Sequence, residues 1–219
     1  MKIIKIFLPL AILNLISLVL VTFTLPDIVP IHLTVGGVVD GFGSKWYIPV
    51  LGMIPLVLTT VYIFYRYYQK ENENKSIEDK IFPLIIMFTV AITWIPVFIS
   101  FNFSKNHVLD IITIVFIAIA ILFIILGYYM GSIKRNKYLG IRTPWTLKDD
   151  IVWKKTHNLA TYSYMVSGFV LIIYSIAGFI SENVIYFFIG LAIALFLTVV
   201  LPVSYSYYDY RKNKDFNNL

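Results

Sequence analysis

Residues 111–130, IITIVFIAIAILFIILGYYM, form a continuous apolar run without a charged side chain. At about 1.5 Å per helical residue, a run of this length crosses the roughly 30 Å hydrocarbon core of a bilayer. The whole chain agrees with this pattern, because 59% of its 219 residues are apolar, only 14% are charged and the mean hydropathy is +0.80. Such a composition is typical of membrane proteins and excludes an ordinary soluble domain.

Five further apolar runs are long enough to span the bilayer, and none contains Asp, Glu, Lys or Arg. They are approximately Ile6 to Leu25, Tyr47 to Tyr65, Ile81 to Phe101, Leu159 to Ile180 and Val184 to Val203. The first follows two lysines as a signal peptide would, but no small-x-small cleavage site precedes Pro26, so we interpret it as a retained helix. The sequence therefore predicts an all-α, polytopic membrane protein, a bundle of six transmembrane helices.

The distribution of cations predicts the orientation. If the N-terminus is cytoplasmic, sixteen of the 18 Lys and Arg residues lie on the cytoplasmic side, and only Lys45 and Lys105 lie outside. Loops rich in Lys and Arg are retained in the cytoplasm. We therefore expect a multi-pass protein of the cell membrane with both termini cytoplasmic.

The first outer segment, Pro26 to Trp46, predicts a small extracellular cap. Its prolines end the preceding helix, Ile31 to Val35 alternates like a short strand, and Gly36-Gly37 and Asp40-Gly41 are typical of turns. The other two outer loops are too short to hold a site alone. The candidate residues for recognition outside the cell are Pro30, His32, Gly36, Asp40, Gly41 and Lys45.

Residues 134–157, KRNKYLGIRTPWTLKDDIVWKKTH, form the largest inner loop and carry seven of the cations. Gly140 permits a turn, and Pro144 favours an extended Thr143. Thr146 stands three residues before Asp149, as in a capping box, which predicts a helix that starts at Leu147 and continues into the fifth span.

Two interpretations of this loop are open. Arg142, Thr143, Trp145 and Trp153 could form a docking face for a partner. Alternatively, Arg142 pairs with a lipid phosphate or with Asp149 or Asp150, and the tryptophans anchor the loop among the membrane lipids. Residue types alone favour the second interpretation.

The loop also resembles a known family. Asn136, the stretch 139–149 (LGIRTPWTLKD), Val152-Trp153 and residues 156–158 (THN) resemble the pattern of the SdpI family of bacterial membrane proteins. The residues that carry this resemblance are Asn136, Gly140, Arg142, Thr143, Pro144, Trp145, Thr146, Asp149, Trp153 and His157. Residues 25–45 are similar to an uncharacterised membrane domain that often precedes the SdpI pattern.

The resemblance implies an immunity protein that protects the cell against a secreted, membrane-active peptide toxin. It further implies signalling in which a cytoplasmic transcriptional repressor is drawn to the membrane, without direct contact between this chain and nucleic acid. The implied organisation is a two-helix membrane domain at 1–70, a cytoplasmic linker at 71–80, and an SdpI-like four-helix domain at 81–219 whose loop spans 131–158.

The sequence disfavours two other classes of function, a transporter or channel and an enzyme. A small-solute transporter or channel is disfavoured because ion pathways usually keep ionisable groups within the bilayer, whereas the spans here offer only Asn14, Thr and Ser. An enzyme is disfavoured because the chain has no Cys and no nucleophile-elbow, phosphate-loop or HExxH motif. A zinc site would need His32, His107 and Asp40, or His157 with Asp149 and Asp150. We expect no catalytic residue, cofactor or metal.

Overall fold

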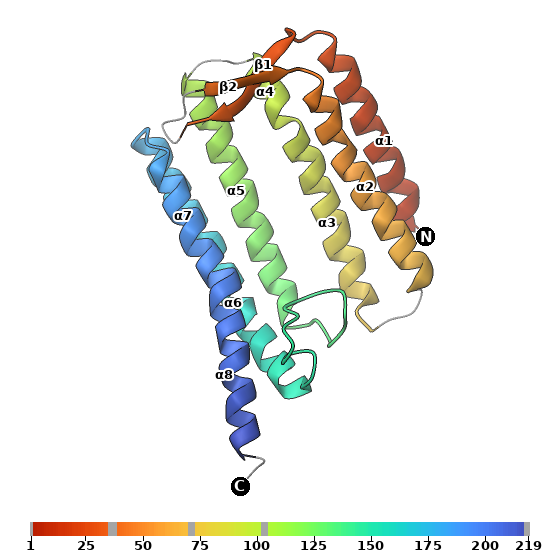
Figure 1. The fold of residues 1–219 in the computed structure, drawn as a ribbon, viewed down its shortest axis with the longest axis vertical. Coiled ribbons are helices and arrows are strands. Elements are labelled where there is room, and N and C mark those ends of the chain that lie inside the picture. The colour runs from red at the N-terminus through yellow and green to blue at the C-terminus, as the bar shows by residue number, and fades with distance from the viewer. Residues whose placement is uncertain (1, 35–38, 70–72, 102–104, 217–219) are drawn as a thin grey trace. The chain divides into compact units, whose positions relative to one another are not determined.

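The structure is a computed structural model that describes residues 2–34, 39–69, 73–101 and 105–216 (Figure 1). It divides into two compact units. The first unit comprises Met1–Val115 and Glu182–Val184, and the second comprises Phe116–Ser181 and Ile185–Leu219. The boundary between Val115 and Phe116 falls within the long helix α5 (Lys105–Met130).

The described residues confirm an all-α polytopic membrane protein with six helical passes. The passes are α1 (Lys2–Thr22), α2 (Tyr47–Tyr68), α3 (Lys75–Thr93) with α4 (Ile95–Phe101), α5 (Lys105–Met130), α6 (Asp150–Ile180), and α7 (Ile185–Leu195) with the π-helix η1 (Phe196–Val200) and α8 (Leu201–Phe216). Five passes are long and apolar enough to cross a bilayer. The apolar part of α1, Ile6–Thr22, is shorter. Many large apolar side chains on these helices are exposed, as expected for surfaces that face lipid.

In the first unit, α1, α2 and α3 pack side by side, and a β-hairpin follows α1 (Figure 1). Strands β1 (Ile28–Leu33) and β2 (Val39–Ser44) pair antiparallel, with Pro30 opposite Phe42 and an irregular register around His32. The predicted cap is thus an ordered hairpin. The prediction of a turn at Asp40-Gly41 was wrong, because both residues lie in β2, where Gly41 pairs with His32. Gly36 and Gly37 lie outside the described residues.

The third pass is broken at Trp94, between α3 and α4. Pro96 explains the break, because its missing N–H leaves the Ile92 carbonyl without the usual helical partner and its ring disfavours a regular turn. The Trp94 N–H instead closes a tighter turn on the Ala91 carbonyl at 3.2 Å. Pro55 and Pro83 are accommodated inside continuous helices.

The second unit is built around α6, which packs against α7 and α8. Small residues let the helices approach closely: a Cβ added to Gly168 would overlap Ile124 and the Ala120 carbonyl of α5. The π-helix η1 ends just before Pro202, and it widens the turn where this proline cannot donate a hydrogen bond. The Ala194 carbonyl accepts from Thr198 Oγ1 at 2.7 Å and from Ser167 Oγ at 3.4 Å.

A buried ion cluster joins the adjacent ends of α2 and α3. Arg66 Nη1 lies 3.3 Å from Glu78 Oε2, and Arg66 Nη2 lies 3.4 Å from Asp79 Oδ1. The Tyr65 hydroxyl donates to Glu78 at 2.7 Å, and the Tyr62 hydroxyl donates to Asp79 at 2.9 Å. Glu78 is only 1% exposed. Both carboxylates fall within the predicted cytoplasmic linker at 71–80, and in the structure they lie in the first turns of α3.

Replacing Arg66 by Met should destabilise the protein by about 3 kcal/mol, because it removes the cationic partner of a buried carboxylate. Thermal unfolding in detergent measures the effect. Tyr65→Phe is the matched control, since it removes one neutral donor to the same carboxylate and should cost about 1 kcal/mol. Equal losses for the two variants would contradict the role assigned to the ion pair.

Candidate functional site

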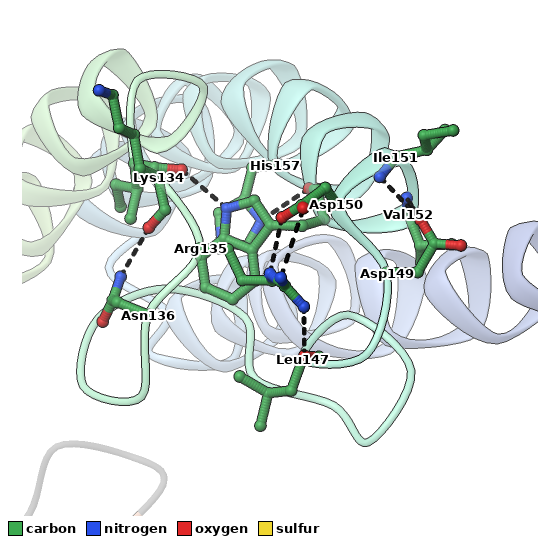
Figure 2. Close-up of polar contacts among 11 residues, drawn as sticks. Lys134, Arg135, Asn136, Leu147, Asp149, Asp150, Ile151, Val152 and His157 are labelled. Atoms are coloured by element: carbon green, nitrogen blue, oxygen red, sulfur yellow. Dashed lines mark hydrogen bonds and ion pairs between the residues drawn. The ribbon is translucent and has the colours of Figure 1, made fainter. Parts of the chain in front are cut away.

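The inner loop begins with a turn organised by Asn136. Its Oδ1 accepts hydrogen bonds from the backbone N–H groups of Tyr138 and Leu139, each at 2.7 Å. Its Nδ2 donates to the Lys134 carbonyl at 2.8 Å, a contact drawn in Figure 2. Asn stabilises turns in this way because its side chain replaces backbone partners. The position of Asn136 in the family pattern therefore has a structural cause.

His157 holds the middle of the loop against α6. Its Nε2 accepts the Ile141 N–H at 3.0 Å, and its Nδ1 donates to the Trp153 carbonyl at 2.9 Å. These partners require the neutral tautomer with the proton on Nδ1. Gly140 is needed beside it, because its φ is +99° and a Cβ there would overlap His157 Nε2.

The environment of His157 keeps the ring neutral. The imidazole is 1% exposed and stacks on Trp153 with 4.1 Å between ring centroids. Burial lowers the pKa of His157 below its ordinary value of about 6.5, and the hydrogen bond to the Trp153 carbonyl acts in the opposite direction. α6 has 31 residues, about 46 Å, so it extends beyond the bilayer core. His157 precedes the predicted span at Leu159 and lies in this extension.

Trp153 fixes the first part of the loop. Its indole Nε1 donates to the Ile133 carbonyl at 2.7 Å, and its side chain is buried. Ile133 follows the end of α5 by three residues, so this bond ties the exit of α5 to the second turn of α6. Because a buried indole offers no surface to a partner, the position of Trp153 fits a structural role and not the docking-face interpretation.

A buried hydroxyl cluster attaches the loop to α8. Thr146 Oγ1 donates to the Ile141 carbonyl at 2.8 Å and accepts the Thr143 N–H at 2.9 Å. Thr143 Oγ1 and the indole Nε1 of Trp145 both contact Ser206 Oγ, at 3.2 Å and 2.5 Å. The Trp145 ring also packs on Tyr207, with 5.1 Å between centroids. The loop is therefore a folded element held by two helices.

The start of α6 differs from the prediction. The helix begins at Asp150, and Asp149 is its N-cap, whose Oδ1 accepts from the N–H groups of Ile151 at 2.7 Å and Val152 at 3.1 Å (Figure 2). Thr146 does not form the predicted capping box, because its hydroxyl is used inside the loop. An Asp at the N-cap satisfies the exposed donors of the first turn directly.

The two arginines of the loop both bond to other loop residues or to the start of α6. Arg135 Nε pairs with Asp150 at 2.6 Å and its Nη1 donates to the Leu147 carbonyl at 2.8 Å (Figure 2). Arg142 is exposed, and its Nη1 donates to the Lys137 carbonyl at 2.8 Å. Of the predicted docking residues, Arg142 is exposed, Trp145 is half-buried and Thr143 is buried. Pro144 is also exposed.

The hairpin gathers most of the other predicted site residues. His32 Nδ1 and Asp40 Oδ1 lie 2.5 Å apart on the exposed side of the strands. Gly41 lies against His32, and a Cβ there would approach the His32 Cβ to 2.7 Å. Lys45 Nζ pairs with Asp27 and donates to the Leu25 carbonyl, both at 3.1 Å, so it fastens the base of the hairpin to the end of α1.

The inner zinc set, His157 with Asp149 and Asp150, is not assembled in the structure. Both nitrogens of His157 already have protein partners, Asp149 caps α6 and Asp150 pairs with Arg135. His32 lies beside Asp40, and the side chain of His107 lies outside the described residues. Within the described part of the chain, no group of three or more His, Asp and Glu residues could hold a metal ion.

Sequence reasoning missed the residues of α8 that receive the loop. Besides Ser206, the buried Asp209 accepts from Lys155 Nζ of α6 at 2.8 Å, a bond that raises the pKa of Lys155. Ser206 and Asp209 are three residues apart and share one helix face. This spacing was the signal in the sequence that could have revealed a polar helix face. The tyrosines around it, Tyr205, Tyr207, Tyr208 and Tyr210, instead indicated an aromatic belt at the membrane surface.

Two family models match the chain. The SdpI/YfhL protein family matches residues 132–206, and a domain of unknown function, DUF1648, matches residues 10–59. The chain is 30% identical over 162 residues to the immunity protein SdpI of Bacillus subtilis (strain 168). That alignment covers 73% of this chain and 74% of the relative. No solved structure matches the chain.

Gly140→Ala should destabilise the loop by about 2 kcal/mol, because alanine is strained at this positive φ and its methyl group would displace His157. Limited proteolysis of the loop and thermal unfolding in detergent measure the loss. Lys148→Ala, an exposed change in the same loop, should leave both measurements unchanged. A Gly140→Ala protein with wild-type protease resistance would disprove the close packing.

The stability of the protein should fall as the pH drops below about 6.5. There the unfolded chain binds a proton at His157 while the folded chain, with its lowered pKa, resists protonation, so unfolding is favoured; above that pH the effect vanishes. Unfolding temperatures at pH 7.5 and 5.5 measure it. The His157→Asn variant should have a lower unfolding temperature than the wild type at pH 7.5, but its unfolding temperature should fall less between pH 7.5 and pH 5.5. An equal fall in the variant and the wild type would rule out His157 as the source of the pH dependence.

Proposed function

Because the chain belongs to the SdpI family, we propose that it is an integral membrane immunity protein that protects its cell against a secreted, membrane-active peptide toxin. The observation that carries this proposal is the 30% identity to an immunity protein over 73% of the chain. The matched regions include both the hairpin and the inner loop. The role is binding and protection, without catalysis.

We assign the hairpin to the outer face and the loop to the cytoplasm, with both termini inside. The support is the distribution of Lys and Arg, which are retained in cytoplasmic loops. A toxin that arrives from outside then meets the β1–β2 hairpin first. The domain division at residues 70 and 81 is part of the same proposal.

The exposed side of the hairpin suits an amphipathic peptide. Ile28 is 65% exposed and Phe42 is 55% exposed, and Ile28 pairs with Ser44 while Phe42 pairs with Pro30. Phe23, just after α1, and Trp46, just after β2, are also exposed and meet edge to face, with 5.5 Å between ring centroids. Exposed aromatic and aliphatic side chains provide contact area for the apolar face of a peptide, and the His32–Asp40 pair adds polar partners.

The exposed side of the inner loop is the candidate contact for a cytoplasmic repressor. It presents the cations Lys137, Arg142 and Lys148 together with Tyr138, while the buried residues hold the loop in one conformation. A rigid basic surface favours an acidic partner surface. The repressor, in turn, would be the component that contacts nucleic acid.

Expression of the chain in a toxin-sensitive host should restore growth in the presence of a candidate secreted peptide. Phe42→Ser should reduce this protection at an unchanged membrane level of the protein, because it removes exposed apolar area from the hairpin. Ser44→Ala, on the same strand face, is the matched control and should protect fully.

Failure of the wild-type protein to protect against every candidate peptide would overturn the immunity proposal. Protection that survives Phe42→Ser would move the toxin contact away from the hairpin. For signalling, Arg142→Ala should reduce recruitment of the repressor to membranes while protection against the toxin persists. Loss of both together, at normal protein level, would contradict separate outer and inner roles.

A further inference from the structure

Asn14 is a buried carboxamide in the middle of α1, where the hydrocarbon core makes polar groups costly. It is 5% exposed. Its Nδ2 donates to Thr93 Oγ1 at 3.3 Å, and its Oδ1 accepts the indole N–H of Trp94 at 2.9 Å. Both partners belong to the third pass, and they are the last residue of α3 and the residue at which that pass is broken.

At the break, Trp94 keeps two backbone hydrogen bonds: its N–H donates to the Ala91 carbonyl at 3.2 Å, and its carbonyl accepts from the Phe98 N–H at 3.1 Å. Pro96 removes one backbone donor from the turn that follows, so the direction of α4 relative to α3 is less constrained by backbone hydrogen bonds than it would be in a continuous helix. The side-chain bond from Asn14 to Trp94 crosses from α1 to this point. It therefore fixes the break from a neighbouring helix.

The Trp94 ring connects the break to the hairpin. It packs against a buried apolar cluster that consists of Leu18, Leu25, Val29, Ile48 and Val97. Val29 comes from β1 and is fully buried, and Val97 comes from α4, which packs against β1. Tyr47 packs against the same cluster, and its hydroxyl donates to the Pro30 carbonyl at 2.9 Å.

We propose that Asn14 is a positioning residue for the β1–β2 hairpin: through the indole of Trp94 it sets the break in the third pass and the apolar cluster on which the hairpin rests. The importance of this role for toxin binding rests on the proposed function. The positioning itself does not, because it concerns the order of the hairpin in the absence of any ligand.

Trp94→Phe tests the role most directly. It keeps an aromatic ring in the cluster and removes only the indole N–H, which leaves the Asn14 carbonyl oxygen without this donor. Hydrogen exchange of the full-length protein in lipid nanodiscs, followed at residues 28–33 and 39–44, should become about threefold to tenfold faster, since one such bond in a membrane contributes a modest free energy. Asn14→Leu should give a similar increase.

The double variant Asn14→Leu with Trp94→Phe should show less than the product of the two single effects, because neither polar partner is then left alone. Thr59→Val is the matched control. Thr59 is buried in α2 of the same unit, but its hydroxyl donates within its own helix, to the Pro55 carbonyl at 2.7 Å. Its loss should leave the exchange of the hairpin unchanged.

Exchange at the hairpin that does not exceed the Thr59→Val value would overturn the positioning role. So would an increase spread evenly over α1, α2 and the hairpin, because that pattern reports general destabilisation. If hairpin exchange rises in Trp94→Phe while toxin protection is intact, the positioning role stands and the hairpin is not the toxin contact. If exchange is unchanged and protection is lost, the positioning role falls and the immunity proposal stands.

Discussion

The bilayer requires every buried polar group to find its partner inside the protein, and this constraint shapes both units. Hydroxyls in the spans donate to the carbonyl four residues earlier: Thr22 to Leu18, Thr59 to Pro55, Ser175 to Leu171 and Thr198 to Ala194. At Pro96 the third pass responds to the missing backbone donor with the break at Trp94, and the last pass accommodates Pro202 with the π-helix η1, whereas Pro55 and Pro83 stay inside continuous helices. The Asn14 carboxamide of α1 finds its partners in another helix, because it bonds to Thr93 and Trp94 of the third pass.

Outside the apolar spans, water can form hydrogen bonds with the polar groups of a loop, so a loop does not need a fixed fold. Residues 131–149 nevertheless form a specific structure. The residues of the family pattern serve mainly this structure. Asn136 makes a turn, Asp149 caps α6, and Trp153 and His157 hold the backbone of the loop. A functional defect caused by changing these buried residues would therefore report the loss of the folded loop, whereas Arg142 and its exposed neighbours can report contact with a partner.

The hairpin is small and depends on the helices beneath it. A two-stranded sheet is marginal by itself, so its order requires packing against other elements. Val29 supplies that packing from below, while Lys45 and Tyr47 bond to the carbonyls of Leu25 and Pro30. This division leaves Ile28 and Phe42 exposed on the other side. An exposed apolar surface and its buried support are thus built from alternate residues of the same strands.

The sequence by itself determined the six apolar passes, the ordered segment after the first of them, and the family, because hydrophobic runs of membrane length and a dozen fixed positions are local signals. It did not determine which loop residues are buried. Trp153 and Thr143 were candidates for a docking face, but both are buried in the structure, where Thr143 contacts Ser206 of α8. The spacing of Ser206 and Asp209 places them on one helix face, but it does not show that they contact the loop and Lys155. The tertiary structure also decided the partners of Glu78 and Asn14, because these bonds join helices whose relative rotation is not encoded in the composition of either one.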